Sequence, residues 1–340
     1  MRIVTFGEIM LRLKSPALER LFQSPQLEAT FGGGEANVAV SLANYGEDAA
    51  FVTILPDTDI GRAALRELRG LGVDTNSIRF KPGRLGVYYL ETGAMQRPSK
   101  VIYDRADSCV SLAGPGDIDW AGVFSGAGWF HITGITPAIS PTCAGLSLEA
   151  VKTAAEMGLH VSCDLNYRKN LWKYGKAPHE VMGGLVRYID TVIANEEDIQ
   201  KALGIGADHQ VKGGHLDPAA YKALAVAVKK AYPNVSRVAI TLRSSHSADH
   251  NTWAACLYNG KDFFLSREYE MNDIVDRVGG GDSFSGGLIY GLTHYPDEEA
   301  LNFAVAASCL KHSISGDYNR VSLSEVKALM GGSGSGRVER

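Results

Sequence analysis

Three consecutive glycines followed by an aspartate, Gly279, Gly280, Gly281 and Asp282, are the residues of this sequence best suited to chemistry. Glycines allow backbone N–H groups to approach an anion closely, and the helix-like segment that follows would add unpaired N–H donors and a partial positive charge. Asp282 would then lie where it can accept the proton of a substrate hydroxyl during phosphoryl transfer. The alternative is a glycine-rich turn without chemical function, which is common before helices.

A second glycine-rich segment, Phe-Gly-Gly-Gly-Glu-Ala-Asn-Val-Ala at residues 31–39, also leads into a predicted helix. Its glycines, Gly33 among them, would admit a polar ligand close to the backbone, and the Asn37 amide could bind ligand hydroxyls. Asn37 could equally satisfy the backbone of its own helical turn. The sequence supports the two interpretations equally.

The composition limits the partners of the chain. Its 340 residues carry a formal net charge of -4, which provides no basic surface for nucleic acid or for an anionic membrane. The five cysteines are widely spaced and include no C-x-x-C pair, which favours a reducing cytoplasm over disulfides or a zinc site. We expect no signal peptide and no membrane-spanning helix. The predicted protein is cytoplasmic and binds a small molecule.

The elements that must position these residues are short β-branched runs that alternate with helical stretches. The predicted strands are residues 3–6, 50–55, 128–132, 160–164, 191–195 and 237–242. The predicted helices are residues 36–45, 60–71, 141–157, 218–231, 283–292 and 297–312. This alternation predicts a mostly parallel sheet with helices on both faces, and ligands bind such sheets beyond the carboxyl ends of the strands.

Two segments interrupt the alternation. Residues 86–91 and 100–105 have the pattern of hairpin strands, and residues 11–31 show no strong helical pattern. We expect them to form a small β-sheet that projects from the main domain and covers a pocket as a lid. A peripheral sheet that only shields an edge is the alternative.

Three motifs together resemble the ribokinase-like (PfkB) carbohydrate kinases. They are residues 32–39, residues 61–75 with Leu-Arg-Gly-Leu-Gly-Val-Asp-Thr at their end, and residues 276–282, and the resemblance runs in order from about residue 3 to 325. It implies ATP-dependent phosphorylation of a sugar hydroxyl with Mg²⁺. It also implies an α/β three-layer sandwich with a mostly parallel central sheet and a small β-sheet lid. Residues 1–330 would form this kinase domain, with the lid mainly at about 11–31 and 86–105, and residues 331–340 a flexible tail.

Within the family, the resemblance is strongest to the 2-keto-3-deoxygluconate kinases. It rests on Phe-Gly-Glu at 6–8, Ile-Thr-Gly-Ile-Thr-Pro-Ala at 132–138 and Asp-Leu-Asn-Tyr-Arg at 164–168. Guanidinium and phenol donors suit the carboxylate of a sugar acid. Arg105 as a solvated charge on the lid, and Arg168 in an ion pair with Asp164, are the alternatives. The resemblance implies substrate contacts from Gly33, Asn37, Tyr88, Tyr103, Arg105, Arg168 and Asp317.

The resemblance places ATP along the later strand ends. A metal motif of the family, Asn-x-x-Glu, is here Asn195 to Asp198, and Asp198 has one methylene less reach than glutamate. Asp198 would hold Mg²⁺ through an additional water, or Glu197 would take over this role. The residues implied for ATP and its phosphates are Asn166, Asn195, Thr241, Arg243, Gly279 and Gly281.

The chain departs from the family pattern on this nucleotide side. Arg277 and Gly280 stand where the family usually has threonine and alanine, and residues 243–250 replace a more glycine-rich turn. Glycine at 280 preserves the anion site, whereas Arg277 adds a charge that would reach a phosphate or a neighbouring carboxylate.

The predicted function is ATP-dependent phosphorylation of the terminal hydroxyl of 2-keto-3-deoxygluconate, with Asp282 as the base. Fructose or another sugar or sugar acid is the alternative substrate within the family. A non-catalytic sugar- or nucleotide-binding sensor is the alternative from another class, and Asp282 with its three glycines argues against it. Apolar lid residues such as Val87, Tyr89 and Ile102 predict a homodimer or higher homo-oligomer through the lid.

Overall fold

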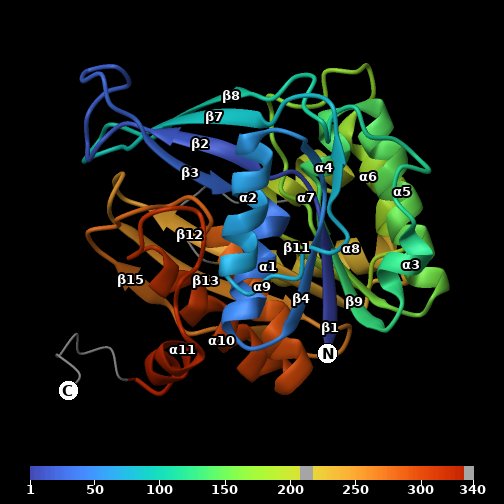
Figure 1. Ribbon diagram of the computed structural model, residues 1–340. Helices are drawn as coiled ribbons and strands as arrows, with labels where there is room; N and C mark the ends of the chain where they lie inside the picture. The colour runs from blue at the N-terminus through green and yellow to red at the C-terminus, as the bar shows by residue number, and fades with distance from the viewer. Residues whose placement is uncertain (207–216, 333–340) are drawn as a thin grey trace.

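A nine-stranded sheet with helices on both faces forms the centre of the computed structural model, which describes residues 1–206 and 217–332 (Figure 1). The strands from β12 to β4 run parallel to their neighbours, and β13 to β15 are antiparallel. The order across the sheet is β14 (Phe263–Leu265), β13 (Asn251–Tyr258), β12 (Arg237–Ser245), β11 (Thr191–Ala194), β10 (His160–Asp164), β9 (Ala127–Thr133), β1 (Arg2–Phe6) and β4 (Asp48–Val52), while β15 (Tyr269–Met271) pairs with β13.

The helices form a layer on each face of this sheet. One layer packs into the largest core cluster and contains α3 (Trp120–Phe124), α5 (Pro141–Glu156), α6 (Pro178–Val186), α7 (Glu196–Leu203) and α8 (Pro218–Ala231). The other layer contains α1 (Gly34–Asn44), α9 (Gly280–His294) and α10 (Asp297–Lys311), with α2 (Asp59–Gly70) and α11 (Leu323–Met330) packed beside it. A short α4 (Thr136–Ile139) follows β9. The result is the expected three-layer α/β architecture.

Burial on both faces explains why the central strands are apolar along their whole length. Every residue of β11 is buried, and so are Val161, Ser162, Cys163 and Asp164 of β10. Parallel strands covered on both sides have no solvent face, so they show continuous hydrophobic runs and not alternation. Asp164, at the carboxyl end of β10, is the acidic residue of these two strands, and it faces the site described below.

A separate four-stranded sheet, called the small sheet here, consists of β2 (Met10–Lys14), β3 (Glu28–Gly32), β7 (Gly86–Glu91) and β8 (Lys100–Asp104). Its order is β3-β2-β7-β8, and Figure 1 shows it above the central sheet near the N-terminal end of α1. The expected pairing of 86–91 with 100–105 is confirmed as an antiparallel hairpin. All five residues of the edge strand β8 are exposed.

The bounds of the elements differ from the expected ones in a few places. The strand expected at 50–55 is two strands, because β5 (Ile54–Pro56) leaves β1 and pairs with β6 (Arg79–Lys81). Helix α9 begins at Gly280, so the glycine run itself supplies its first turn. Most of the expected flexible tail, residues 333–340, lies outside the described residues.

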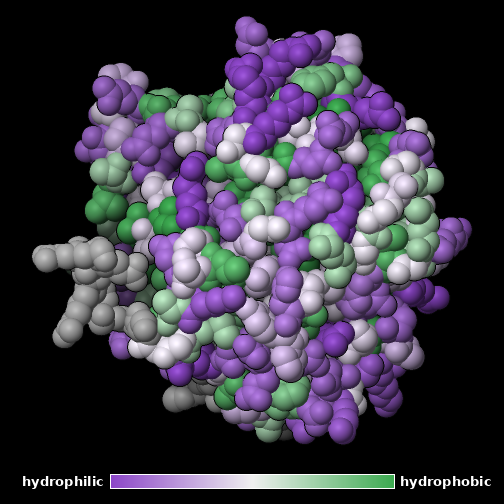
Figure 2. All heavy atoms as spheres, turned by 60° about the horizontal axis from the view of Figure 1, so that its bottom comes forward, coloured by the Kyte–Doolittle hydropathy of each residue, from purple (hydrophilic) through white to green (hydrophobic). Residues whose placement is uncertain are grey.

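The helices of the described ranges can be compared with what a membrane span requires. No helix there has both the length and the apolar character needed to cross a bilayer. Figure 2 shows one face of the molecule, on which hydrophilic side chains predominate and hydrophobic ones are scattered among them.

Candidate active site

A cavity of about 900 Å³ opens between the small sheet and the carboxyl ends of the central strands. Its walls come from β7 and β8, from the ends of β10 to β12, and from the N-terminal ends of α1 and α9. The structure thus brings segments from every part of the chain to one place. The predicted site residues that line it are Gly33, Asn37, Tyr88, Tyr103, Arg105, Asn166, Arg168, Asn195, Asp198, Thr241, Arg243, Gly279, Gly281, Asp282 and Asp317.

The turn before α9 explains why glycines stand there. Gly279 caps the helix in the left-handed conformation with φ 83°, and a Cβ on it would lie 2.0 Å from the carbonyl oxygen of Asp317. Gly280 is buried, and a Cβ there would lie 2.5 Å from the His312 ring. Its N–H donates to the carbonyl oxygen of Arg277 at 3.2 Å, whereas no acceptor for the N–H of Gly281 occurs among the described residues. A helix N-terminus with free N–H groups is suited to bind an anion.

Asp282 lies in the first turn of α9, next to these N–H groups. Its Oδ2 accepts a hydrogen bond of 2.6 Å from Nδ2 of Asn37, which projects from α1. Burial raises the pKa of Asp282 to about 6, and the Asn37 donor opposes this rise. A carboxylate with this pKa is charged at neutral pH and is a better proton acceptor than an ordinary aspartate.

The second glycine segment positions Asn37. Gly33 caps α1, and a Cβ on it would lie 2.0 Å from the carbonyl oxygen of Glu8. Asn37 Oδ1 accepts the N–H of Gly33 at 3.2 Å while Nδ2 binds Asp282. Asn37 therefore satisfies its own helical turn and also lines the cavity, and its binding of ligand hydroxyls stays a prediction.

The small sheet contributes aromatic and charged side chains. Tyr103 is 43% exposed in the cavity wall, and its ring lies 5.9 Å from that of Tyr88. Arg105 is buried, with Nε 2.8 Å from Oε2 of Glu8, so the alternative of a solvated lid charge is wrong. Its guanidinium carbon lies 5.7 Å from the centre of the Tyr103 ring. The Arg105 guanidinium and the Tyr103 phenol therefore lie next to each other in the cavity wall.

Arg168 is one of several exposed cations that line the cavity. It follows β10, lines the wall and donates to the carbonyl oxygen of Tyr167 at 3.1 Å. The alternative of an ion pair with Asp164 is not seen, because Oδ1 of Asp164 accepts the N–H of Asn166 at 3.1 Å instead. Most guanidinium donors of Arg168 thus remain available for a ligand.

Three carboxyl groups face one another across the strand ends. Burial raises the pKa of Asp164 well above its ordinary value, and the charges of Asp198 and Asp282 raise it further. Burial also raises the pKa of Asp198 to about 6. Asp198 closes a capping box with Asn195, and its Oδ1 accepts the N–H of Tyr167 at 2.9 Å. Within the described ranges, no cluster of three His, Cys, Asp or Glu side chains has the spacing of a metal site.

Arg277 forms no ion pair with a carboxylate among the described residues, and its contact with a phosphate stays a prediction. Its Nε donates to the carbonyl oxygen of Ala248 at 2.7 Å, and Nη2 donates to that of Ser247 at 2.6 Å. It therefore anchors the loop of residues 246–250 to the turn that precedes α9, while residues 243–245 of the expected loop are the end of β12. Thr241 and Arg243 line the cavity on the strand that leads into this loop.

The sequence did not single out three charged residues that support the site, Glu8, Glu35 and Arg12. Glu8 pairs with Arg105, and Glu35 accepts hydrogen bonds from the hydroxyls of Thr133 and Thr136, both at 2.8 Å. Arg12 binds the carboxylates of Asp276 and Asp317. A buried charge has no periodicity of its own, so the pattern carries no signal for Glu8 or Glu35, whereas Arg12 could have been noticed as a basic residue between two leucines of β2.

Comparison with known proteins agrees with this geometry. The crystal structure of 2-dehydro-3-deoxygluconokinase from Thermotoga maritima superposes with a TM-score of 0.91 at 46% identity, covering 97% of this chain and 99% of that one. A 2-dehydro-3-deoxygalactonokinase of Haloferax volcanii is 33% identical over 98% of both chains. A probable fructokinase-3 of Arabidopsis thaliana is 28% identical over 84% of this chain and 76% of its own.

A ribokinase-like sandwich with a carboxylate beside a helix start suited to bind an anion is the arrangement expected of a small-molecule kinase. Residues 1–322 match the pfkB family of carbohydrate kinases, and the chain belongs to that family.

Proposed function

We propose that this protein transfers the γ-phosphoryl group of ATP to the terminal hydroxyl of 2-keto-3-deoxygluconate. The observation that carries the proposal is the position of Asp282, a carboxylate of raised pKa at the N-terminus of α9 that faces the cavity beside Asn37. The 46% identical relative from Thermotoga maritima is a kinase of this sugar acid.

In the proposed reaction, the terminal hydroxyl oxygen of the sugar attacks the γ-phosphorus of ATP, and Asp282 accepts the hydroxyl proton. The bond between the γ-phosphorus and its bridging oxygen breaks, and ADP leaves. The backbone N–H groups of Gly279 and Gly281 stabilise the charge on the transferring group, which is where most of the acceleration in such reactions arises, whereas the N–H of Gly280 already donates to Arg277. The small sheet closes over the cavity as a lid and excludes water.

The sugar acid is favoured over a neutral sugar because of the cations in the wall. Arg168 has free guanidinium donors, and Arg105 lies against the ring of Tyr103. Planar guanidinium groups bind carboxylates in two-point contacts. Gly33, Asn37, Tyr88 and Asp317 complete the proposed contacts with the hydroxyls.

Two other substrates have specific support. The galactonate epimer is the substrate that the name of the Haloferax volcanii relative gives, and fructose is the one that the name of the Arabidopsis thaliana relative gives. A coupled ADP-release assay, with mass spectrometry of the product, tests the proposal. One phosphate added to the sugar acid supports it, whereas thermal stabilisation by sugar acids without ADP release would favour a sensor.

The nucleotide side fits ATP with Mg²⁺. Asn166, Asn195, Thr241, Arg243, Gly279 and Gly281 line the part of the cavity proposed for ATP. Burial raises the pKa values of Asp164 and Asp198, the charge of Asp198 raises that of Asp164 further, and carboxylate oxygens are the ligands that Mg²⁺ prefers. When bound, Mg²⁺ neutralises phosphate charge. We place it near Asp198, with Glu197 as the alternative ligand.

Chelation of divalent cations with EDTA is expected to abolish ADP release, and added Mg²⁺ should restore it. Asp198→Asn should raise the Mg²⁺ concentration for half-maximal activity by about 10-fold or more, because the neutral amide is a weaker ligand. Glu197→Gln, at the exposed neighbouring position, is the matched control and should leave the requirement unchanged. A raised Mg²⁺ requirement in Glu197→Gln together with an unchanged one in Asp198→Asn would assign the metal to Glu197.

The pH profile of kcat/KM is expected to lose activity as the pH falls through about 6, because a base must be unprotonated and burial raises the pKa of Asp282 to about 6. An unperturbed aspartate would keep activity down to about pH 4. An acid limb centred near 4, or the same limb persisting in Asp282→Asn, would assign the titration to another group.

The partner proposed besides the sugar is a second copy of the chain, docked through the small sheet. Val101, Ile102 and Tyr103 are exposed on its edge strand β8, and exposed apolar edge strands commonly pair. Light scattering at micromolar concentration that gave the mass of one chain would contradict this. A cytoplasmic location accords with the five cysteines, all of which are unpaired.

A further inference from the structure

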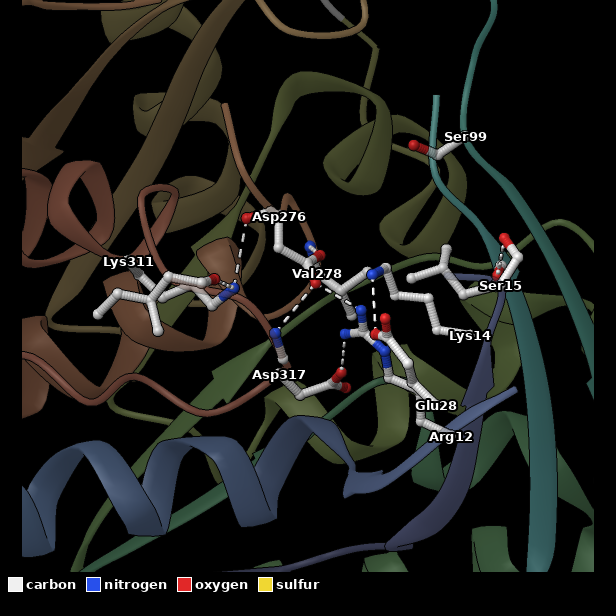
Figure 3. A network of polar contacts seen from close by, with 12 residues as sticks. Arg12, Lys14, Ser15, Glu28, Ser99, Asp276, Val278, Lys311 and Asp317 are labelled. Atoms are coloured by element: carbon white, nitrogen blue, oxygen red, sulfur yellow. Dashed lines mark hydrogen bonds and ion pairs between the residues drawn. The ribbon is translucent and has the colours of Figure 1, made fainter. Parts of the chain in front are cut away.

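Arg12 is a completely buried cation that lies outside the cavity wall. It comes from the middle of β2 in the small sheet, and its side chain is 1% exposed. Its Nη1 lies 2.6 Å from Oδ1 of Asp317, and its Nη2 lies 2.5 Å from Oδ2 of Asp276 (Figure 3). One guanidinium therefore joins the small sheet to the segment before α9 and to the connection after α10.

Asp276 also bonds to the start of the turn at Gly279 to Gly281, which is called the phosphate-binding turn here after its proposed role. Its Oδ1 accepts the N–H of Val278 at 3.1 Å, directly before Gly279. Its Oδ2 accepts the N–H of Gly316 at 3.1 Å, and its backbone carbonyl accepts a hydrogen bond from the buried Lys311 at 3.3 Å. The start of the turn is thus fixed through one carboxylate that Arg12 holds.

A second, apolar contact joins the small sheet to the turn that precedes α9. Val278 packs against Met10, Tyr88 and Leu90, which form a small apolar cluster on the small sheet. Tyr88 also donates to Asp317 at 2.6 Å, so Asp317 is held by two residues of the small sheet. The turn and the small sheet therefore share both a polar and an apolar interface.

Burying four charged groups is not explained by stability alone. Arg12, Lys311, Asp276 and Asp317 are each at most 6% exposed. The cost of removing charges from water often exceeds what their attraction returns, and apolar replacements of such pairs are frequently neutral or stabilising. What the ion pairs supply is a fixed geometry, because a guanidinium fork bonds two carboxylates in defined directions.

We propose that Arg12 is a positioning residue for phosphoryl transfer, which sets the Gly279 to Gly281 turn through Asp276 and the sugar-side carboxylate through Asp317. This inference rests on the proposed function. It adds that the position of the small sheet, which touches the sugar, determines the geometry of the phosphate-binding turn.

Arg12→Lys tests the proposal because lysine keeps the buried charge but cannot bond both carboxylates at once. We expect kcat to fall by about 10²-fold, the loss typical of a misplacement near 1 Å, while the KM for ATP changes by less than about 3-fold. Asp276→Asn should lower kcat similarly. The double variant should lose little more than the worse single variant, since both changes break one link.

Lys14→Met is the matched control. Lys14 lies on the same strand and pairs only with Glu28 of β3, at 3.0 Å, within the small sheet (Figure 3). The kcat of Lys14→Met should match that of the unchanged protein. A kcat of Arg12→Lys within about twofold of that of the unchanged protein, or multiplicative losses in the double variant, would overturn the proposal.

Hydrogen exchange separates a failure of this inference from a failure of the proposed function. Arg12→Lys should accelerate exchange of the amides of residues 276–282, and Lys14→Met should not, whichever sugar is the substrate. If the unchanged protein phosphorylates no sugar, the proposed function fails, and the exchange result still decides the link. Equal exchange in both variants would refute it.

Discussion

Asp282→Asn is expected to lower kcat by about 10²- to 10⁴-fold, the contribution that a positioned general base makes. Asparagine has nearly the same shape and can keep the contact with Asn37, but it cannot accept the hydroxyl proton. The KM for the sugar should change little, because the carboxylate acts on the proton that moves in the transition state. Steady-state kinetics in the coupled ADP-release assay measure both quantities.

Stability provides a second readout for this variant. Folding raises the pKa of Asp282. The charged carboxylate therefore lowers the free energy of unfolding once the pH exceeds the pKa that Asp282 has in the unfolded chain. Asp282→Asn should therefore unfold at the same or a higher temperature at pH 8. Asp273→Asn, an exposed aspartate shortly before the turn, is the control and should keep full kcat. Near-full turnover of Asp282→Asn would remove Asp282 from the role of base.

Arg168→Gln is expected to lower kcat/KM for the sugar acid by roughly 10- to 150-fold, which corresponds to about 1.5–3 kcal/mol for a hydrogen bond to a charged group. The guanidinium of Arg168 makes one hydrogen bond, to a backbone carbonyl, whereas that of Arg105 is paired with Glu8. For fructose, which lacks the carboxylate, the same change should alter kcat/KM by less than about threefold.

A cation nearby serves as the control for this substitution. Lys176 is exposed on the same segment and does not line the cavity, so Lys176→Gln should leave both substrates unaffected. If Arg168→Gln weakened the sugar acid and fructose equally, the arginine would act on something other than the carboxylate.

The regular elements could be predicted because local pattern determines them. The strand at residues 160–164 and the helix at residues 218–231 have the bounds that periodicity predicts. The expected strand at 50–55 was wrong as one unit, since the turn of residues 54–56 toward β6 depends on a partner distant in sequence. Local patterns carry no information on such pairing.

The site was predictable where a motif marks it. The glycine runs indicated Gly33 and Gly279, and the resemblance to the family supplied Arg105 and Arg168. The partners of these residues were not predictable. Arg12 and Asp276 are 264 positions apart in the chain, and whether two charges meet is decided only by tertiary structure.

The panel of sugars tests the central claim most directly. Purified protein would be assayed for ADP release with ATP and 2-keto-3-deoxygluconate, its galactonate epimer, fructose and ribose, and kcat/KM compared. We predict that 2-keto-3-deoxygluconate gives the highest kcat/KM and that both neutral sugars are much poorer substrates. A higher kcat/KM for fructose or ribose than for either sugar acid would contradict the account.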